Sequence, residues 1–341
     1  MSATYMRREI EEIPEAAERL LAGAAPAVAE AARAFRSRDP LVVATVARGS
    51  SDHAAHFLKY AYELVLGIPG ASLGPSLASV YGLVPRLERA VVIAISQSGQ
   101  SPDIVSMTKA ARNGGGSTIA LVNTLPSPLA DASDVAIDIA AGPERSVAAT
   151  KSFVNSIIAG LALLAELEPA GSLKSALAAF PQRLHEALDA KWAPLVEDLA
   201  DARSLYVLGR GPSLAIAGET ALKFKETCGI HAEAYSAAEV MHGPVELVEP
   251  GFPVIALAGR DRAEASVAEI ADELASKGAI VHATTAICRQ AALLHVPAAG
   301  HPLLDALIQV VPAYTCLEAL SRRRGRDPDA PARLRKITET V

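Results

Sequence analysis

The sequence predicts an α/β protein made of two similar units, each with a mainly parallel sheet flanked by helices in three layers. Short apolar runs rich in Val, Ile and Ala alternate with helical stretches, which is the pattern of strands buried on both faces. The runs recur after a shift of about 160 residues, so that Val92-Ile93-Ala94 aligns with Val254-Ile255-Ala256. A length of 341 residues is sufficient for two separate hydrophobic cores.

Local patterns place the elements in order along the chain. Residues 5–38 have the spacing of amphipathic helices, and further helical sequence lies between the units, near residues 165–200. Arg48-Gly49 and Arg210-Gly211 stand at equivalent strand ends, each opening a helix. The expected strands are LVVATVA (41–47), AVVIAIS (90–96) and STIALVN (117–123) in the first unit, and SLYVLGR (204–210), FPVIALA (252–258) and AIVHATT (279–285) in the second.

Composition argues against a nucleic-acid-binding protein. The net charge is −6 and only 4% of the residues are aromatic, so the chain lacks both a basic face and a stacking platform. The basic run Arg322-Arg323-Arg324 is isolated and is interpreted as the end of a helix. We therefore expect no nucleic-acid partner.

The cysteines and the N-terminus point to a soluble cytoplasmic protein. Cys228, Cys288 and Cys316 are far apart and odd in number, which indicates reduced thiols and neither a disulfide framework nor a zinc site. The N-terminal sequence lacks an apolar signal core, and the longest apolar run, near residues 156–167, is too short to cross a bilayer. We expect no membrane association.

A serine-rich loop follows the second predicted strand of the first unit. It reads SQSGQSPD over residues 96–103, whereas the equivalent loop of the second unit is Ala258-Gly259-Arg260-Asp261. Hydroxyls, backbone amides and the positive end of the next helix would suit a phosphate group, because ligands of open α/β sheets collect at the carboxyl ends of strands. An ordinary turn with Ser and Asp as helix caps is the alternative.

Two more polar loops favour the phosphate interpretation. Ser50 and Ser51 follow the first strand, and Ser146 to Lys151 form a later loop, so that three hydroxyl-rich loops are available to one anion. Neither a Gly-rich loop ending in Gly-Lys-Ser/Thr nor a spaced glycine triplet is present. A sugar phosphate therefore fits better than a nucleotide.

The segment LKFKETCGIHAEAYSAAEVMHGP, residues 222–244, concentrates groups suited to acid/base chemistry in a helix and a following loop. Helical spacing puts Glu219, Lys223 and Glu226 on one face, where a base can be held beside a cation. A solvated charged face is the competing interpretation for these three residues. The polar, nearly apolar-free continuation through His242 makes function the better explanation.

Four motifs carry a family resemblance. SQSGQSPD, AGPERSVAATKSF, the 222–244 segment and the tail RGRDPDAPARLRKITETV resemble the sugar isomerase (SIS) domain pair of glucosamine-6-phosphate synthase. The resemblance implies two tandem flavodoxin-like SIS domains. Ser2 stands where the synthase has a nucleophilic cysteine, so no glutaminase chemistry is expected. The implied division is N-terminal helices 1–38, SIS domain 39–165, helical linker 166–195, SIS domain 196–322 and closing tail 323–341.

Double-SIS chains of this kind resemble the isomerase-like type of glucosamine-6-phosphate deaminase, which forms fructose 6-phosphate and ammonia. The resemblance implies that Val147 lines the sugar. Ala149 departs from the family serine, so one hydroxyl contact is absent and substrate orientation is less defined. The residues implied to hold the phosphate and the sugar hydroxyls are Ser50, Ser51, Ser96, Gln97, Ser98 and Ser101.

The same resemblance assigns the acid/base groups. Glu226 is implied as the base that moves a proton between C2 and C1, with Lys223 stabilising its carboxylate and the developing oxyanion. His242 is implied to catalyse ring opening from a neighbouring subunit of a homodimer, and Lys336 to contact the open-chain carbonyl, where it can form a Schiff base. Glu239 and Tyr235 are expected to position the His242 loop. No metal or redox cofactor is required for these proton transfers.

Other activities remain open from sequence. A plain aldose–ketose isomerase or a fructosamine-phosphate deglycase would use the same residues, and glucosamine and galactosamine 6-phosphate are not distinguished. A non-catalytic sugar-phosphate sensor is the alternative from another class. Because Glu226, His242 and Lys336 are all present, the enzyme is favoured.

Overall fold

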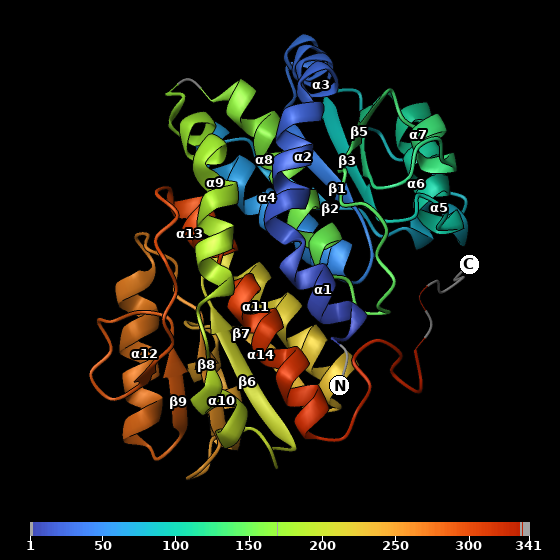
Figure 1. The fold of residues 1–341 in the computed structure, drawn as a ribbon. Coiled ribbons are helices and arrows are strands. Elements are labelled where there is room, and N and C mark those ends of the chain that lie inside the picture. The colour runs from blue at the N-terminus through green and yellow to red at the C-terminus, as the bar shows by residue number, and fades with distance from the viewer. Residues whose placement is uncertain (1–2, 169, 335, 337–341) are drawn as a thin grey trace. The chain divides into compact units, whose positions relative to one another are not determined.

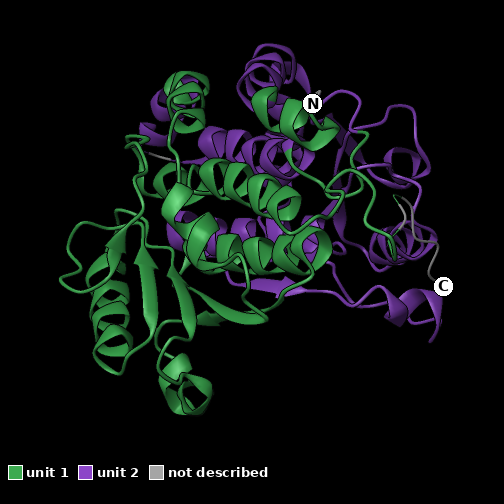
Figure 2. Ribbon diagram, turned by 60° about the horizontal axis from the view of Figure 1, so that its bottom comes forward, with its two compact units in different colours: residues 1–12, 145–150, 179–336 green, residues 13–144, 151–178, 337–341 purple. Residues whose placement is uncertain are grey.

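The computed structural model describes residues 3–168, 170–334 and 336. The chain divides into two compact units (Figure 2): unit 1 contains residues 1–12, 145–150 and 179–336, and unit 2 contains residues 13–144, 151–178 and 337–341. Residues 335 and 337–341 of the predicted closing tail lie outside the described residues. The division therefore assigns the first helix and the 145–150 loop to the same unit as the second half of the chain.

Unit 2 is built around a five-stranded parallel sheet in the order β2-β1-β3-β4-β5. Its three central strands confirm the three runs predicted from sequence. The edge strands β2 and β5 were missed, because they are short and incompletely buried and so lack a continuous apolar run. The strands are β1 (Val42–Val46), β2 (Gly70–Ser72), β3 (Ala90–Ser96), β4 (Ser117–Val122) and β5 (Val135–Asp138).

Helices cover both faces of this sheet. One face packs its alternate side chains, such as Val92 and Ala94, against Ile104 and Met107 of α6 and Leu129 of α7. Helices α3, α4 and α8 contact strands of the same sheet, and α8 is buried along most of its length. The helices are α2 (Ile13–Gly23), α3 (Ala25–Arg38), α4 (Ser50–Leu66), α5 (Ser76–Ser79), α6 (Pro102–Asn113), α7 (Pro128–Ala132) and α8 (Lys151–Leu167).

Unit 1 repeats the topology with a second parallel sheet in the order β10-β9-β8-β6-β7. Numbered from its own first strand, this order is the same as in unit 2, which is the flavodoxin-like arrangement predicted. The strands are β6 (Ser204–Gly209), β7 (His231–Ser236), β8 (Pro253–Ala256), β9 (Ile280–Ala283) and β10 (Ala292–Leu293).

One sequence expectation is wrong in this unit. Residues 231–236 were taken as part of a loop, yet they form strand β7, paired with β6 from Ser204↔His231 to Gly209↔Ser236. Strand β7 lies at the edge of the sheet, and most of its side chains are only partly buried. An edge strand needs no apolar alternation, which is why the pattern gave no strand signal.

The remaining helices belong mainly to unit 1 and are visible with the second sheet in Figure 1. Tyr206 and Leu208 of β6 pack with Val267 and Leu274 of α12, which covers one face. The boundary between the units falls within α9. The elements are α1 (Tyr5–Glu11), α9 (Ser172–Leu188), α10 (Ala193–Asp198), α11 (Pro212–Lys223), α12 (Glu264–Ser276), α13 (Pro302–Leu307) and α14 (Val310–Arg323), with the irregular turns η1 (Phe224–Cys228), η2 (Val240–His242) and η3 (Pro244–Leu247).

Among the residues that the structure describes, one helical stretch, residues 302–323, is long and apolar enough to cross a membrane, but 89% of its most apolar window is buried inside the fold. The stretch comprises α13 and α14, whose side chains such as Leu304 and Leu317 are completely buried. Its apolar character is therefore explained by core packing. As the sequence predicts, the basic run 322–324 is a helix end, with Arg322 and Arg323 in the last turn of α14 and Arg324 as its C-cap.

Gly99 shapes the loop after β3, and its replacement tests the packing there. Its φ is +65°, and a Cβ would lie 2.5 Å from Ser127 Oγ and 2.9 Å from Val122 Cγ2. We expect Gly99→Ala to lower the free energy of unfolding by about 1–3 kcal/mol, measured by urea denaturation, because it adds both backbone strain and overpacking. Gly23→Ala is the control, since nothing lies within 4 Å of its added Cβ. Equal stabilities for the two variants would contradict this account.

Candidate functional site

The first sheet reverses its strand order between β1 and β3, and the two loops at that point carry the predicted phosphate residues. The loop after β1 leads into α4 at Ser50, and the loop after β3 leads into α6 at Pro102. Arg48 Nε donates to Asp103 Oδ2 at 2.5 Å, which ties the two loops together. Asp103 is 1% exposed and Arg48 is 50% exposed, so the pair presents its cationic side to solvent. An anion placed here meets a cation and two helix N-termini.

The serines of these loops serve the backbone in different ways. Ser96 Oγ accepts from Gly99 N at 3.1 Å, and Ser98 Oγ accepts from Gln100 N at 3.2 Å, so both hydroxyls hold the loop in shape while keeping their own protons to donate. Ser101 occupies the N-cap of α6 but makes no side-chain capping bond, and the N-cap of α4 is Gly49. Capping by serine hydroxyls therefore does not explain this loop.

The equivalent point of the second sheet is filled by side chains of the protein itself. Ser213 Oγ accepts from Gly259 N at 3.2 Å, and Thr284 Oγ1 accepts from Ala258 N at 2.8 Å. Thr284 in turn donates to Gln309 Oε1 at 2.7 Å. These three polar side chains are buried, and they bond to the amides of the loop after β8 and to one another. The two copies have diverged at this point, as the difference between their loops predicts.

Glu219, Lys223 and Glu226 form one continuous ion-pair network. Lys223 Nζ lies 2.6 Å from Glu226 Oε2 and 3.2 Å from Glu219 Oε1, and Tyr314 Oη donates to Glu219 at 2.9 Å. The side chains of Lys223 and Glu219 are fully buried, whereas that of Glu226 is 22% exposed. The solvated-face interpretation of these residues is therefore wrong.

The charges of the network follow from its burial. Burial alone lowers the pKa of Lys223, but the adjacent carboxylates of Glu219 and Glu226 outweigh that effect and raise it above its ordinary value. The lysine therefore stays an ammonium ion and lies in direct contact with the Glu226 carboxylate. Glu226 itself lies in η1, a π-helical turn that continues α11, and such turns are frequent at functional sites.

A cavity of about 730 Å³ opens beside Glu226. Residues from the end of α11, from η1 and from the C-terminal tail line this cavity. Arg326 packs against Gly229, whose φ is +62°, with Arg326 Cζ only 2.2 Å from where a Cβ would stand. The residues around the cavity are Leu222, Lys225, Glu226, Gly229, Arg326, Pro331, Ala332, Arg333 and Leu334.

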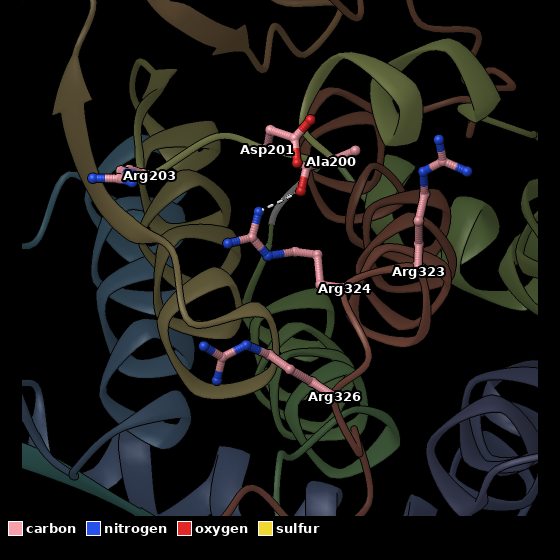
Figure 3. Close-up of a pocket in the computed structure, with 6 residues that line it drawn as sticks. All are labelled: Ala200, Asp201, Arg203, Arg323, Arg324 and Arg326. Atoms are coloured by element: carbon pink, nitrogen blue, oxygen red, sulfur yellow. Dashed lines mark hydrogen bonds between the residues drawn. The ribbon is translucent and has the colours of Figure 1, made fainter.

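Arg326 also lines a second, arginine-rich cavity of about 570 Å³, drawn in Figure 3 with Ala200, Asp201, Arg203, Arg323 and Arg324. Arg324 extends into it and donates to Ala200 O at 2.6 Å, and it also donates to Cys228 O at 3.1 Å. Arg323 pairs with Glu197 at 2.6 Å. These two arginines are therefore used to hold the end of α14 against neighbouring segments.

His242 ends the turn η2 and is exposed to solvent. It does not line the cavity beside Glu226, although both belong to unit 1. The loop that contains His242 is stabilised by Tyr206, a residue that the sequence analysis did not identify. Tyr206 Oη donates to Pro244 O at 3.0 Å. Tyr235 packs edge-on against Tyr206 with centroids 5.0 Å apart.

The two residues expected to position the His242 loop contact it unequally. Glu239 accepts from His242 N through its backbone carbonyl at 2.9 Å, while its side chain is exposed. Tyr235 reaches the loop only through Tyr206 and donates its own hydroxyl to Glu233 at 2.7 Å. That hydrogen bond, with burial, raises the pKa of Tyr235 to about 12, so its hydroxyl keeps its proton at neutral pH.

In unit 1, hydrogen bonds connect the loop that contains Val147 with the C-terminal tail that contains Lys336. Lys336 Nζ donates to Ser146 O at 2.6 Å, and Val147 N donates to Asp329 O at 3.0 Å. The six predicted phosphate and sugar residues, from Ser50 to Ser101, belong to unit 2, whereas Val147 and the four acid/base residues belong to unit 1. No group of three His, Cys, Asp or Glu side chains suited to a metal occurs within residues 3–168, 170–334 and 336.

The comparison with protein families matches this architecture. A model described as the SIS domain matches residues 42–166 and residues 198–320. The chain belongs to the SIS domain family. Both matched stretches carry the five-stranded sheet and the strand reversal described above, so the chain is a tandem of two SIS domains.

Curated relatives of this double-SIS chain are longer proteins. It is 33% identical over 348 residues to glutamine–fructose-6-phosphate aminotransferase (isomerizing) of Aquifex aeolicus, with 99% of this chain and 58% of the relative covered. It is 34% identical over 358 residues to the enzyme of the same description from Pyrobaculum aerophilum, with 99% and 57% covered. The chain thus spans little more than half the length of these relatives.

Solved structures give a match over nearly the whole double-SIS chain. A protein from Silicibacter pomeroyi DSS-3, assigned provisionally as a phosphosugar isomerase, has a TM-score of 0.93 and 54% identity, covering 96% of this chain and 100% of that chain. Glucosamine-6-phosphate deaminase from Thermotoga maritima has a TM-score of 0.78 and 21% identity, covering 99% and 100%. The second likeness concerns the fold alone.

Replacing Lys223 tests how much the ion-pair network of Glu219, Lys223 and Glu226 contributes to stability. Lys223→Met leaves two carboxylates without their buried partner, and we expect it to lower the free energy of unfolding by about 3–5 kcal/mol. Lys225→Met, an exposed neighbour on the same turn, is the matched control and should have little effect. Urea denaturation measures both variants. A loss no larger than that of the control would show that the ion pairs contribute little.

The pH dependence of that loss has a defined sign. The pKa of Lys223 is raised above 10.5, so its stabilising charge is fully present below that pH and disappears only as the pH rises through the higher folded-state value. The difference between wild type and Lys223→Met should be constant from about pH 7 to about pH 10 and should shrink above that range. A difference that already falls between these limits would contradict the assignment.

Proposed function

We propose that this protein is a glucosamine-6-phosphate deaminase that forms fructose 6-phosphate and ammonia. The observation that carries the proposal is the Lys223–Glu226 pair, in which a buried ammonium group holds a partly exposed carboxylate at a cavity lined by the C-terminal tail. A carboxylate that is held in place beside a cation at such a cavity suits an enzyme that transfers protons. The likeness to the isomerizing aminotransferases supports an amino-sugar phosphate as substrate.

The reaction divides into steps that these side chains suit. His242 transfers a proton as the bond between C1 and the ring oxygen breaks, which produces the open-chain aldehyde. Glu226 removes the C2 proton, and delivery of a proton to C1 leaves an imine at C2. Water adds to that imine, and breakage of the C2–N bond releases ammonia and leaves the ketone. Lys223 stabilises negative charge beside Glu226, and Lys336 binds the open-chain carbonyl.

The phosphate is assigned to the loops after β1 and β3. Arg48 supplies positive charge there, and the hydroxyls of Ser96 and Ser98 remain able to donate. In the second sheet, the polar side chains at the corresponding strand reversal bond to the loop and to one another. This supports a single phosphate site per chain.

We assign His242 to the active site of a neighbouring subunit in a homodimer. The support is that His242 is exposed and lies outside the cavity lined by Glu226, although both belong to the same unit. Ring opening would then require a second copy of the chain, which makes the dimer the catalytic form.

A plain aldose–ketose isomerase is the second candidate, favoured by the 54%-identical protein assigned provisionally to phosphosugar isomerisation. It would use Glu226 in the same proton transfer but would act on a sugar phosphate without an amino group. Release of ammonia separates the two activities.

The direct test is to give the purified protein glucosamine 6-phosphate and to measure ammonia and fructose 6-phosphate together. We expect equal amounts of both products, and Glu226→Gln should lower kcat by about 10²–10⁴-fold because the base is lost. Glu246→Gln, an exposed carboxylate in η3, is the control. Galactosamine 6-phosphate, glucose 6-phosphate and a phosphorylated fructosamine are assayed alongside.

Each other outcome of that assay points elsewhere. Ketose formation from glucose 6-phosphate without ammonia would identify the isomerase, and turnover of the fructosamine alone would identify a deglycase. Binding of fructose 6-phosphate with no turnover of any substrate would indicate a sugar-phosphate sensor and refute the enzyme.

Complementation tests the shared site. Glu226→Gln and His242→Ala should each be nearly inactive, yet a mixture that exchanges subunits should recover about one quarter of the wild-type activity, because one site of each mixed dimer is intact. Unmixed proteins treated identically are the controls. Activity that stays at the sum of the separate variants after proven exchange would place His242 in its own subunit's site.

A further inference from the structure

The N-terminal helix supplies a buried carboxylate to the loop that carries Val147. Glu9 of α1 is 4% exposed, and its carboxylate accepts hydrogen bonds from the backbone amides of Arg145 and Ser146 and from Ser146 Oγ. A buried carboxylate is costly unless several donors satisfy it, and here all the donors named belong to two consecutive residues of one loop. Glu9 therefore fixes the loop immediately before Val147.

The C-terminal tail is fixed to the same two segments by Asp329. Its carboxylate accepts from Tyr5 N at 2.8 Å and from Met6 N at 2.7 Å, the first two amides of α1, where the helix dipole favours negative charge. Its backbone carbonyl accepts from Val147 N at 3.0 Å. Asp329 thus joins the tail to both α1 and the loop.

Helix α1 is itself held firmly in unit 1. Arg7 Nη2 pairs with Glu318 Oε2 at 2.6 Å, and Thr4 Oγ1 donates to Glu318 Oε1 at 2.9 Å. Glu318 is completely buried in α14. Because α1 is anchored to a core helix, Glu9 can act as a rigid support for the loop.

We propose that Glu9 and Asp329 are positioning residues, which together set Val147 and Lys336 in the geometry needed for turnover. Lys336 Nζ donates to Ser146 O at 2.6 Å, so the lysine is placed by the carbonyl of the very residue whose amide and hydroxyl bind Glu9. The four segments form a clasp, defined here as Glu9, residues 145–147, Asp329 and Lys336. The catalytic part of this inference rests on the proposed function.

The variants Glu9→Gln and Asp329→Asn test the clasp. Each keeps the size of the side chain but replaces one acceptor oxygen by an NH₂ group that faces a donor. Glu11→Gln, an exposed carboxylate on the same helix, is the matched control. Circular dichroism and thermal unfolding confirm that each variant folds, and Asp329→Asn, at a partly exposed position, covers the case in which Glu9→Gln does not.

The chemical reactivity of Lys336 tests whether the clasp exists, and this test does not depend on enzyme activity. The rate at which an amine-acylating reagent modifies Lys336, followed by mass spectrometry, should rise several-fold in both folded clasp variants and stay unchanged in the control, because the bond to Ser146 O is loosened. An unchanged rate in a folded variant would overturn the clasp.

Steady-state kinetics with glucosamine 6-phosphate then test positioning. We expect kcat to fall about tenfold or more in both variants, with a smaller change in KM, since a displaced lysine weakens the reaction more than binding of the phosphate. A raised acylation rate with unchanged kcat would overturn the positioning role. Inactivity of the wild type would instead refute the proposed function, while the acylation result would still decide whether the clasp exists.

Discussion

The buried ammonium group of Lys223 is the interaction on which this site depends. It is shared by Glu219, which anchors it to Tyr314 of the core helix α14, and by Glu226, which reaches the cavity. Lys223 and Glu219 are both completely buried, and burying their opposite charges together avoids the large cost of burying either one alone. The same network therefore joins α11 to α14 and holds the carboxylate of Glu226, which lies in a π-helical turn. The charge of Lys223 therefore contributes both to the stability of the fold and to the candidate catalytic group.

The two sheets show how one topology has been used in two ways. Both have the same strand order, and therefore the same crevice at the reversal of their strands. In the first sheet the crevice keeps serine hydroxyls, helix N-termini and Arg48. In the second, Ser213, Thr284 and Gln309 bind one another and satisfy the loop amides internally. Duplication supplied two potential sites, and internal hydrogen bonding has closed one.

The compact units do not follow the order of the sequence, and this has a physical cause. Residues 145–150 and helix α1 belong to the same unit as the second half of the chain, and polar contacts join them to it, since Asp329 accepts from Tyr5 N and Val147 N and Glu318 pairs with Arg7. Apolar packing contributes as well, because Met6 and Ile10 of α1 are completely buried. In this way three distant stretches of chain reach one part of the molecule.

The sequence by itself determined the parallel α/β architecture, the duplication and the central strands, because strands buried on both faces need continuous apolar runs. It also indicated that Glu219, Lys223 and Glu226 share a face, since helical spacing is a local property. Only the tertiary structure revealed the edge strand β7, the burial of Lys223, the support of the His242 loop by Tyr206 and the role of Glu9. Each of these depends on partners distant in sequence, and whether a charged residue is solvated or buried is decided by those partners and not by its neighbours along the chain.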